Sequence, residues 1–90
     1  NQVLIITQNP NLAPLEIEKF ITAPIELAMA NIPGLRETRS MSKFGLSNVT
    51  LIFDDAVDVY RARQLVFERL KELENDVPPE MGVPTLAPVS

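Results

Sequence analysis

Cysteine and histidine are both absent from the 90-residue sequence. Without cysteine the chain forms no disulfide and offers no thiolate to a metal ion. Without histidine it also lacks a common nitrogen ligand of zinc, copper and nickel, and the commonest general base of enzymes. Carboxylates and three methionines are the metal ligands that remain. From the sequence we therefore assign no catalytic residue, no metal-binding residue and no cofactor, and we expect that the chain is not an enzyme.

Basic residues and long apolar runs are scarce as well. Eight Lys and Arg stand against twelve Asp and Glu, which gives a formal charge of −4. A negative chain is poorly suited to nucleic acid, whose binding depends on neutralising phosphates, and to anionic membrane surfaces. Apolar runs such as Val3–Ile6 are four residues long, whereas a helix needs about 20 residues to span a bilayer. No signal-peptide pattern opens the chain, and a start at Asn1 leads us to expect a piece of a longer protein.

The first half of the sequence predicts a strand, a helix and a strand. The β-branched run 3–7 predicts the first strand and is followed by turn residues at 8–11. Pro14 suits the first turn of a helix, and apolar residues then recur at three- and four-residue spacing. This predicted buried face consists of Ile17, Phe20, Ile21, Pro24, Ile25, Ala28, Met29 and Ile32. Pro24 cannot donate to the Phe20 carbonyl, so we expect a kink there, and residues 31–34 end the helix.

The second half repeats this order. Residues 35–43 are polar and alternating and predict a solvated or partner-facing strand, while 47–53 predict the second strand of the same hairpin around the turn at 44–45. Asp58 is suited to cap the helix that follows, from 58 to 73. Its apolar face holds Val59, Ala62, Leu65, Val66, Leu70 and Leu73. Residues 77–82 end the helix, and a short strand within 84–88 follows, which its prolines restrict to an edge.

The order β-α-β-β-α-β predicts one α+β domain over residues 1–90. Two split βαβ units form a ferredoxin-like fold, a four-stranded antiparallel sheet with both helices on one face. Leu4 and Ile6 point to the face opposite Val3 and Ile5, and Ile52 points to the face opposite Leu51 and Phe53, yet all of these residues are apolar. We therefore expect a neighbour over the second face of the sheet, and self-association through that face in its absence.

Two groups of side chains could hold a cation. The carboxylates of Asp54, Asp55 and Asp58 suit a hard cation such as Ca²⁺ or Mg²⁺, but they equally suit a loop with a helix cap, and the spacing of a calcium-binding EF-hand is absent. The methionines suit Cu(I) or ordinary packing; they are Met29, Met41 and Met81. In both cases we favour the structural interpretation.

Four blocks of the sequence resemble the heavy-metal efflux branch of the resistance–nodulation–division (RND) transporters. They are residues 22–26 (TAPIE), 32–35 (IPGL), 40–47 (SMSKFGLS) and 58–66 (DVYRARQLV). They fall in the family's order and spacing, and the resemblance covers essentially the whole chain. The sequence is most similar to the cobalt–zinc–cadmium and nickel group of these pumps, and then to the copper–silver group. One departure is Asp55-Ala56-Val57-Asp58 where the family usually has Asp-Gly-Thr-Asp.

The resemblance implies a place and a role. In the family this stretch follows the first transmembrane helix and forms the first of four periplasmic porter subdomains in each protomer. The pumps are inner-membrane trimers that exchange protons for metal cations and join a periplasmic adaptor and an outer-membrane channel. The helix at 58–73 would pack around the trimer axis, and its polar stripe would face the central pore; we assign to that stripe Gln64, Glu68 and Lys71. The resemblance places the family's proton-relay and metal-binding residues outside this chain.

Two other classes of protein share some of these features. A small ligand-binding regulatory domain of the same ferredoxin-like fold fits the predicted elements and would pair with a second copy around a shared pocket. An RNA-binding domain needs aromatic and basic residues on the outer face of the sheet. The negative charge and the single tyrosine, predicted on a helix, argue against RNA binding.

Overall fold

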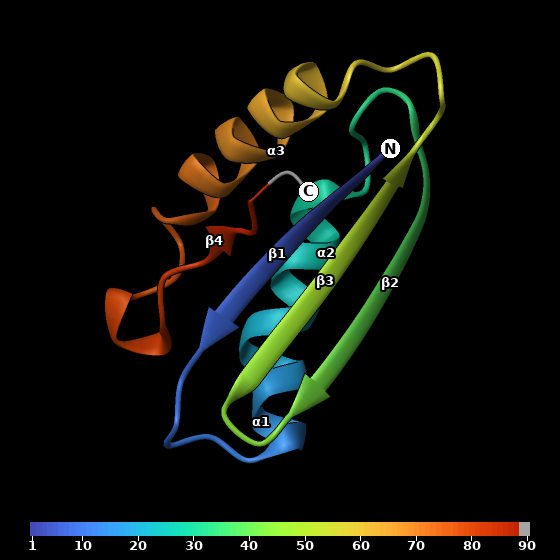
Figure 1. Ribbon diagram of the computed structural model, residues 1–90. Coiled ribbons are helices and arrows are strands. Elements are labelled where there is room, and N and C mark those ends of the chain that lie inside the picture. The colour runs from blue at the N-terminus through green and yellow to red at the C-terminus, as the bar shows by residue number, and fades with distance from the viewer. Residues whose placement is uncertain (89–90) are drawn as a thin grey trace.

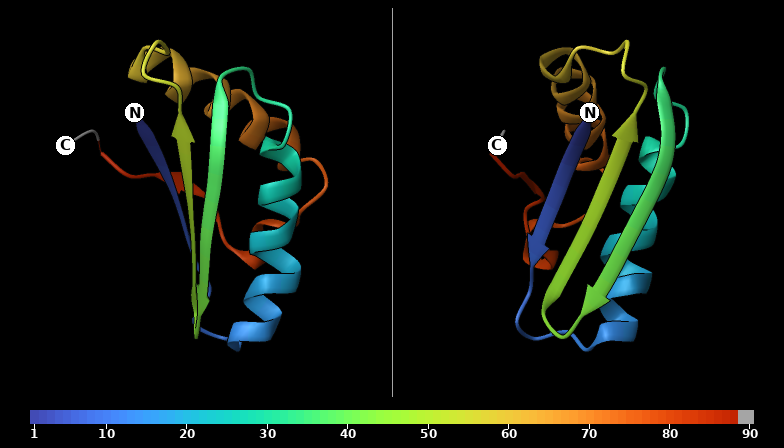
Figure 2. Two further views of the ribbon diagram at one scale, coloured as in Figure 1. Left: turned by 90° about the vertical axis from the view of Figure 1, so that its right-hand side faces the viewer. Right: turned by 45° about the vertical axis from the view of Figure 1, so that its right-hand side comes forward.

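A computed structural model describes residues 1–88 and shows a four-stranded antiparallel sheet with its helices on one face (Figures 1 and 2). The strands are β1 (Gln2–Gln8), β2 (Leu35–Lys43), β3 (Leu46–Phe53) and β4 (Thr85–Leu86), in the order β2-β3-β1-β4. The helices are α1 (Pro14–Ile17), a π-helical turn (Glu18–Thr22), α2 (Ala23–Met29), α3 (Val59–Leu73) and a 3₁₀ turn (Pro79–Met81). The predicted α+β ferredoxin-like fold is confirmed.

Alternation along the central strands places their apolar residues against the helices. In β1, Val3 and Ile5 are fully buried, and they pair across the ladder with Leu51 and Val49 of β3. Because paired residues of antiparallel strands lie on the same face of a sheet, these four side chains form one apolar surface. The opposite face carries the residues between them, which are half-buried or exposed. The strand pairing thus follows the pattern that the sequence predicts.

One continuous helix, from Pro14 to Met29, covers β2 and β3, with α1 and α2 joined by the π-helical turn. Its buried residues Ile17, Ile21, Ile25 and Met29 follow each other at intervals of four. An α-helix turns about 100° per residue, so twelve residues would rotate the last of them about 120° away from the first. The π-turn is wider, with about 80° per residue, and removes roughly 90° of that drift. All four side chains can therefore reach the same core.

Pro24 lies just after this turn, and the helix continues through it. The amide of Ala23 donates to the Glu18 carbonyl, five residues back, and the next residue, Pro24, has no amide hydrogen. The sequence predicted a kink at Pro24; the structure has a π-helical turn directly before α2, and the helix continues through Pro24 as predicted. The prediction that Phe20 lies on the buried face is wrong: 40% of its surface is exposed, and it lines an open groove.

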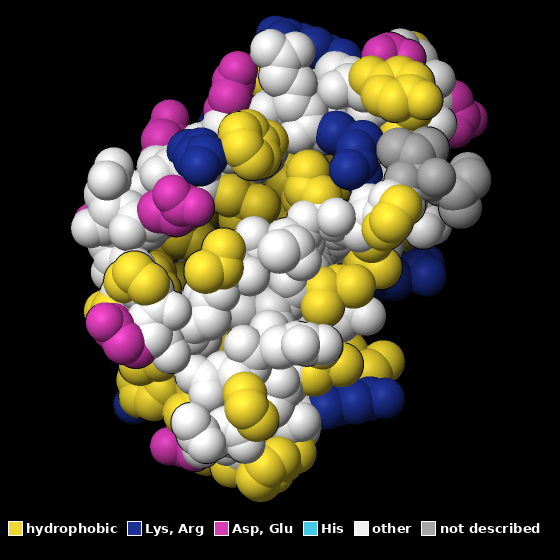
Figure 3. Space-filling model, turned by 60° about the vertical axis from the view of Figure 1, so that its left-hand side comes forward, with side chains coloured by type: hydrophobic (Ala, Val, Ile, Leu, Met, Phe, Trp, Pro, Cys, Tyr) yellow, Lys and Arg dark blue, Asp and Glu magenta, His cyan; other side chains and the backbone are white. Residues whose placement is uncertain are grey.

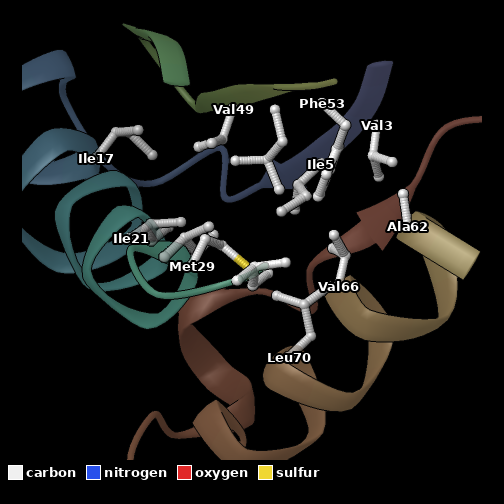
Figure 4. Packing of buried hydrophobic residues seen from close by; sticks show 13 residues of the cluster. Val3, Ile5, Ile17, Ile21, Met29, Val49, Phe53, Ala62, Val66 and Leu70 are labelled. Carbon is white, nitrogen blue, oxygen red and sulfur yellow. The ribbon is translucent and has the colours of Figure 1, made fainter. Parts of the chain in front are cut away.

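The core lies between the sheet and the two helices (Figure 4). Ile21 and Met29 from the first helix point toward Val66 and Leu70 of α3, below Ile5 of the sheet. The thirteen buried residues of the core are Val3, Ile5, Ile17, Ile21, Ile25, Met29, Ile32, Val49, Leu51, Phe53, Ala62, Val66 and Leu70.

The chain after α3 is held to the end of β1 by one side chain. Asn9, nearly buried, donates through Nδ2 to the carbonyls of Met81 (3.2 Å) and Glu80 (3.4 Å) and accepts at Oδ1 from the Asn11 amide (3.1 Å). Gly82 follows with φ 109°, and a Cβ there would lie 2.6 Å from the Gln8 carbonyl oxygen. This turn delivers β4 to the free edge of β1, where only two residues pair.

Candidate functional site

The candidate site is the outer face of α3. Asp58 precedes the helix in an extended conformation, and its carboxylate accepts from the Arg61 amide at 3.2 Å, which confirms the predicted N-cap. Ala62, Val66 and Leu70 are buried at three- to four-residue spacing, so the helix presents one face to the core. The loop before it needs no glycine, because Ala56, like every described residue other than glycine, has a negative φ.

The three predicted stripe residues are all exposed, and two of them are in contact. Gln64 Nε2 donates to Glu68 Oε1 at 3.5 Å, and Gln64 Oε1 accepts from Arg61 Nη1 at 3.3 Å. Lys71 pairs instead with Glu74, with 3.8 Å between Nζ and Oε2. These are solvated i,i+3 and i,i+4 contacts that contribute a few tenths of a kcal/mol each. The stripe thus holds one neutral, one negative and one positive side chain, and its weak contacts leave it exposed to solvent.

Two aromatic residues on the same face were missed in the sequence. Tyr60 and Phe67 are 68% and 51% exposed, and they stand seven residues apart. With Gln64 and Lys71 they form a line at spacings of four, three and four along α3. Such heptad spacing is the pattern by which helices pack against one another. The Lys71 ammonium lies 5.1 Å from the centre of the Phe67 ring. The regular spacing of residues 60, 64, 67 and 71 is the feature of the sequence that could have identified Tyr60 and Phe67 as part of this exposed face.

Two of the three carboxylates of the acidic loop make structural contacts. Asp54 lies 3.4 Å from Arg36 Nε, and Asp58 caps α3. Within residues 1–88, no three acidic, histidine or cysteine side chains are grouped so that they could hold a metal ion. Two of the methionines are also set apart, since Met29 is buried in the core whereas Met41 lies on the opposite face of the sheet, paired with Asn48.

An apolar groove of about 390 Å³ opens where the first helix, the end of α3 and the 77–84 segment meet. Phe20 and Pro24 form one wall, Leu73 another, and Val77 and Val83 the third. The side of the molecule that carries α3 and β4 shows separate charges of both signs around a hollow lined with hydrophobic side chains (Figure 3). Among the described helices, none combines the length and the apolar character that a membrane span requires.

A βαββαβ domain with an exposed, mixed-charge amphipathic helix is suited to contact other protein surfaces. The model of the AcrB/AcrD/AcrF family matches residues 1–90, and the chain belongs to that family. The cation efflux system protein CzcA of Alcaligenes sp. (strain CT14) is 51% identical over 89 residues. The nickel and cobalt resistance protein CnrA of Cupriavidus metallidurans is 44% identical over 89 residues. Each match covers 99% of this chain and 8% of the relative. The resemblance to the heavy-metal efflux branch of RND transporters is confirmed.

Solved structures agree with the sequence comparison. A crystal structure of a heavy metal efflux pump superimposes on all of this chain, with a TM-score of 0.90 and 34% identity, and the match covers 9% of that pump. A second crystal form gives a TM-score of 0.86 with 37% identity over 99% of the chain. The chain thus spans less than a tenth of the length of the relatives that it matches.

Proposed function

We propose that this chain is the first porter subdomain of a longer RND pump that exports heavy-metal cations. The observation that carries the proposal is the match along the whole chain, 51% identical to a cation efflux protein and superimposable on part of a heavy metal efflux pump. The complete pump would be a trimer in the bacterial inner membrane, driven by protons and joined to a periplasmic adaptor and an outer-membrane channel. Residues 1–90 would lie on its periplasmic side and pack against other porter subdomains of the same polypeptide.

The role proposed for the chain itself is structural. Asp58 caps α3, and Asp54 and Glu74 form ion pairs. In this proposal the chain would carry out no chemistry and retain no metal. The contribution would come from α3, which would pack near the trimer axis with Gln64, Glu68 and Lys71 toward the central pore. The exposed Tyr60 and Phe67, at heptad spacing, supply apolar contact area for the neighbouring copies.

Metal resistance in cells tests the transport proposal. The complete gene that encodes this chain should raise the concentration of cobalt, zinc, cadmium or nickel that a pump-deficient bacterium tolerates, and deletion of residues 1–90 should abolish the effect. A Phe67→Glu change places a charge on the surface of α3 that is proposed to contact the neighbouring copies. It should lower resistance and weaken the trimer on native gels. Glu72→Gln is the matched control, because Glu72 is also exposed on α3 but lies outside the line of residues 60, 64, 67 and 71. If the complete gene confers resistance to none of these metals, the proposal is wrong.

A further inference from the structure

The groove between the first helix, the end of α3 and the 77–84 segment has the dimensions of a small-molecule site. Its volume is about 390 Å³, within the range of roughly 300–1,000 Å³ that ligand pockets in proteins span. One turn of an α-helix with its side chains occupies roughly 400–600 Å³, from its diameter and pitch. The groove therefore holds less than one turn of a protein helix, but it can take up the whole of a small organic molecule.

The walls of the groove are held in place by the fold itself. Three of the lining residues have the fixed φ of proline; they are Pro24, Pro79 and Pro84. The turn at 79–82 is anchored by Asn9, which donates to two of its carbonyls at 3.2 and 3.4 Å. A groove that is already formed loses little conformational entropy when it takes up a molecule, and this favours binding.

The charge at the rim of the groove favours one class of molecule. In the described part of the chain, Glu74 is the one charged residue that lines the groove, and the walls around it are apolar. Its Oε2 lies 3.8 Å from Lys71 Nζ, which is longer than a hydrogen bond, so the carboxylate can accept from another donor. Lys71 does not line the groove, and its ammonium also lies 5.1 Å from the centre of the Phe67 ring. Apolar walls with a single carboxylate complement an apolar molecule that carries a positive charge.

We propose that this groove is a binding site for a small organic cation, a molecule with an apolar ring and one protonated amine. The ring lies among Phe20, Leu73 and Val83, and the amine donates a hydrogen bond to the carboxylate of Glu74. None of the three stripe residues of α3 lines the groove. The proposal therefore goes beyond the function proposed above and does not depend on it.

Three naphthalene compounds of similar size and different charge test the proposal. At neutral pH, 2-naphthylmethylamine is a cation, 2-naphthylmethanol is neutral and 2-naphthoate is an anion. Equilibrium dialysis should show that the amine binds about threefold more tightly than the alcohol, a modest factor because the Glu74 side chain is 49% exposed. The anion should bind more weakly than both. Amide shift changes in NMR spectra of the 90-residue chain should map to the lining residues. Equal affinities for the three compounds, or shift changes elsewhere, would overturn the proposal.

Two variants separate the charged and the apolar parts of the site. Glu74→Gln keeps the shape of the side chain and removes its charge, so the amine should lose its advantage over the alcohol. Val83→Trp should fill the groove and weaken the binding of all three compounds by about tenfold; Val83 is 59% exposed, so the variant should fold, as its amide spectrum would show. Leu27→Trp is the matched control, because Leu27 is 80% exposed on α2 and does not line the groove. Undiminished binding to Val83→Trp would refute the site.

Dialysis with the longer polypeptide tests whether the groove is open there. The same order of affinities, lost in the Val83→Trp variant, supports the proposal. No binding of the amine to the longer polypeptide would mean that another segment fills the groove, and the proposal would be wrong. Binding of the amine to a protein that confers no metal resistance would leave this proposal standing and refute the proposed function alone.

Discussion

The hydroxyl cluster below the π-helical turn gives a quantitative test of the fold. Thr22 is fully buried, and its Oγ1 lies 2.8 Å from Ser42 Oγ and 2.7 Å from Ser47 Oγ. Thr22→Val keeps the shape of the side chain and removes the hydroxyl. Ser42 is half-buried and can turn to water, but Ser47 is fully buried and loses its partner.

An unpaired buried hydroxyl costs about 1–3 kcal/mol. Within residues 1–88, Thr7 Oγ1 is buried without a hydrogen-bond partner. Thr7 stands opposite Ser47 in the strand register, so it offers Ser47 a replacement. We therefore expect the lower end, a loss of about 1–2 kcal/mol in the free energy of unfolding. A domain of this size has a total stability of roughly 5–13 kcal/mol, so the variant stays folded and the loss is measurable.

Urea denaturation followed by circular dichroism measures the loss. With a slope of about 1 kcal/mol per molar urea, the midpoint of Thr22→Val should fall by roughly 1–2 M. Thr22→Val combined with Ser47→Ala removes both partners, so the double variant should lose less than the sum of the two single variants. A midpoint within 0.2 M of the parent, or strict additivity in the double variant, would refute the role given to this cluster.

Three further predictions concern other parts of the chain. Gly82→Ala should lower the free energy of unfolding by about 2 kcal/mol or more, measured by urea denaturation, because the new Cβ would lie 2.6 Å from the Gln8 carbonyl oxygen at a φ of 109°. Asn9→Ala should cost about 2 kcal/mol in the same assay and speed amide exchange in residues 79–86, because two carbonyls lose their donor. Calorimetric titration of the chain with Zn²⁺, Co²⁺, Ni²⁺ or Cu⁺ should show no tight stoichiometric binding; a one-to-one complex would contradict the structural role.

The elements that follow a simple local period were predictable from the sequence. Alternation showed that Val3 and Ile5 share one face of their strand, as do Leu51 and Phe53 of theirs, but because residues on both faces are apolar it did not show which face meets the helices. The spacing in α3 did identify its buried face. Asp58 was identified as a cap because its side chain acts on the amides immediately after it.

The features that depend on contacts distant in sequence were not predicted. Asn9 bonds to residues more than 70 positions later, and Thr22 meets Ser47 only after the first helix has docked on the sheet. Phe20 was placed in the core because its spacing matched an ideal α-helix. The strict four-residue spacing from Ile17 to Met29 was the overlooked signal, because in a regular α-helix these residues would drift by about 120° and a wider turn reduces that drift.

The candidate site on α3 could be predicted only in part from the sequence, because its role depends on contacts with surfaces outside this chain. Polar spacing on α3 identified Gln64, Glu68 and Lys71 as exposed, and the structure agrees. Their place at a pore remains a proposal, since it depends on surfaces beyond residues 1–90. Tyr60 and Phe67 were assigned to neither face of the helix from the sequence, and the structure shows that both are exposed.

An electron cryomicroscopy structure of the longer polypeptide tests the central claim most directly. The account predicts a trimer in which the three copies of α3 surround one axis and Gln64, Glu68 and Lys71 line the opening between them. A protein in which α3 lies away from every symmetry axis, or in which Gln64, Glu68 and Lys71 are buried against a neighbouring domain, would contradict it.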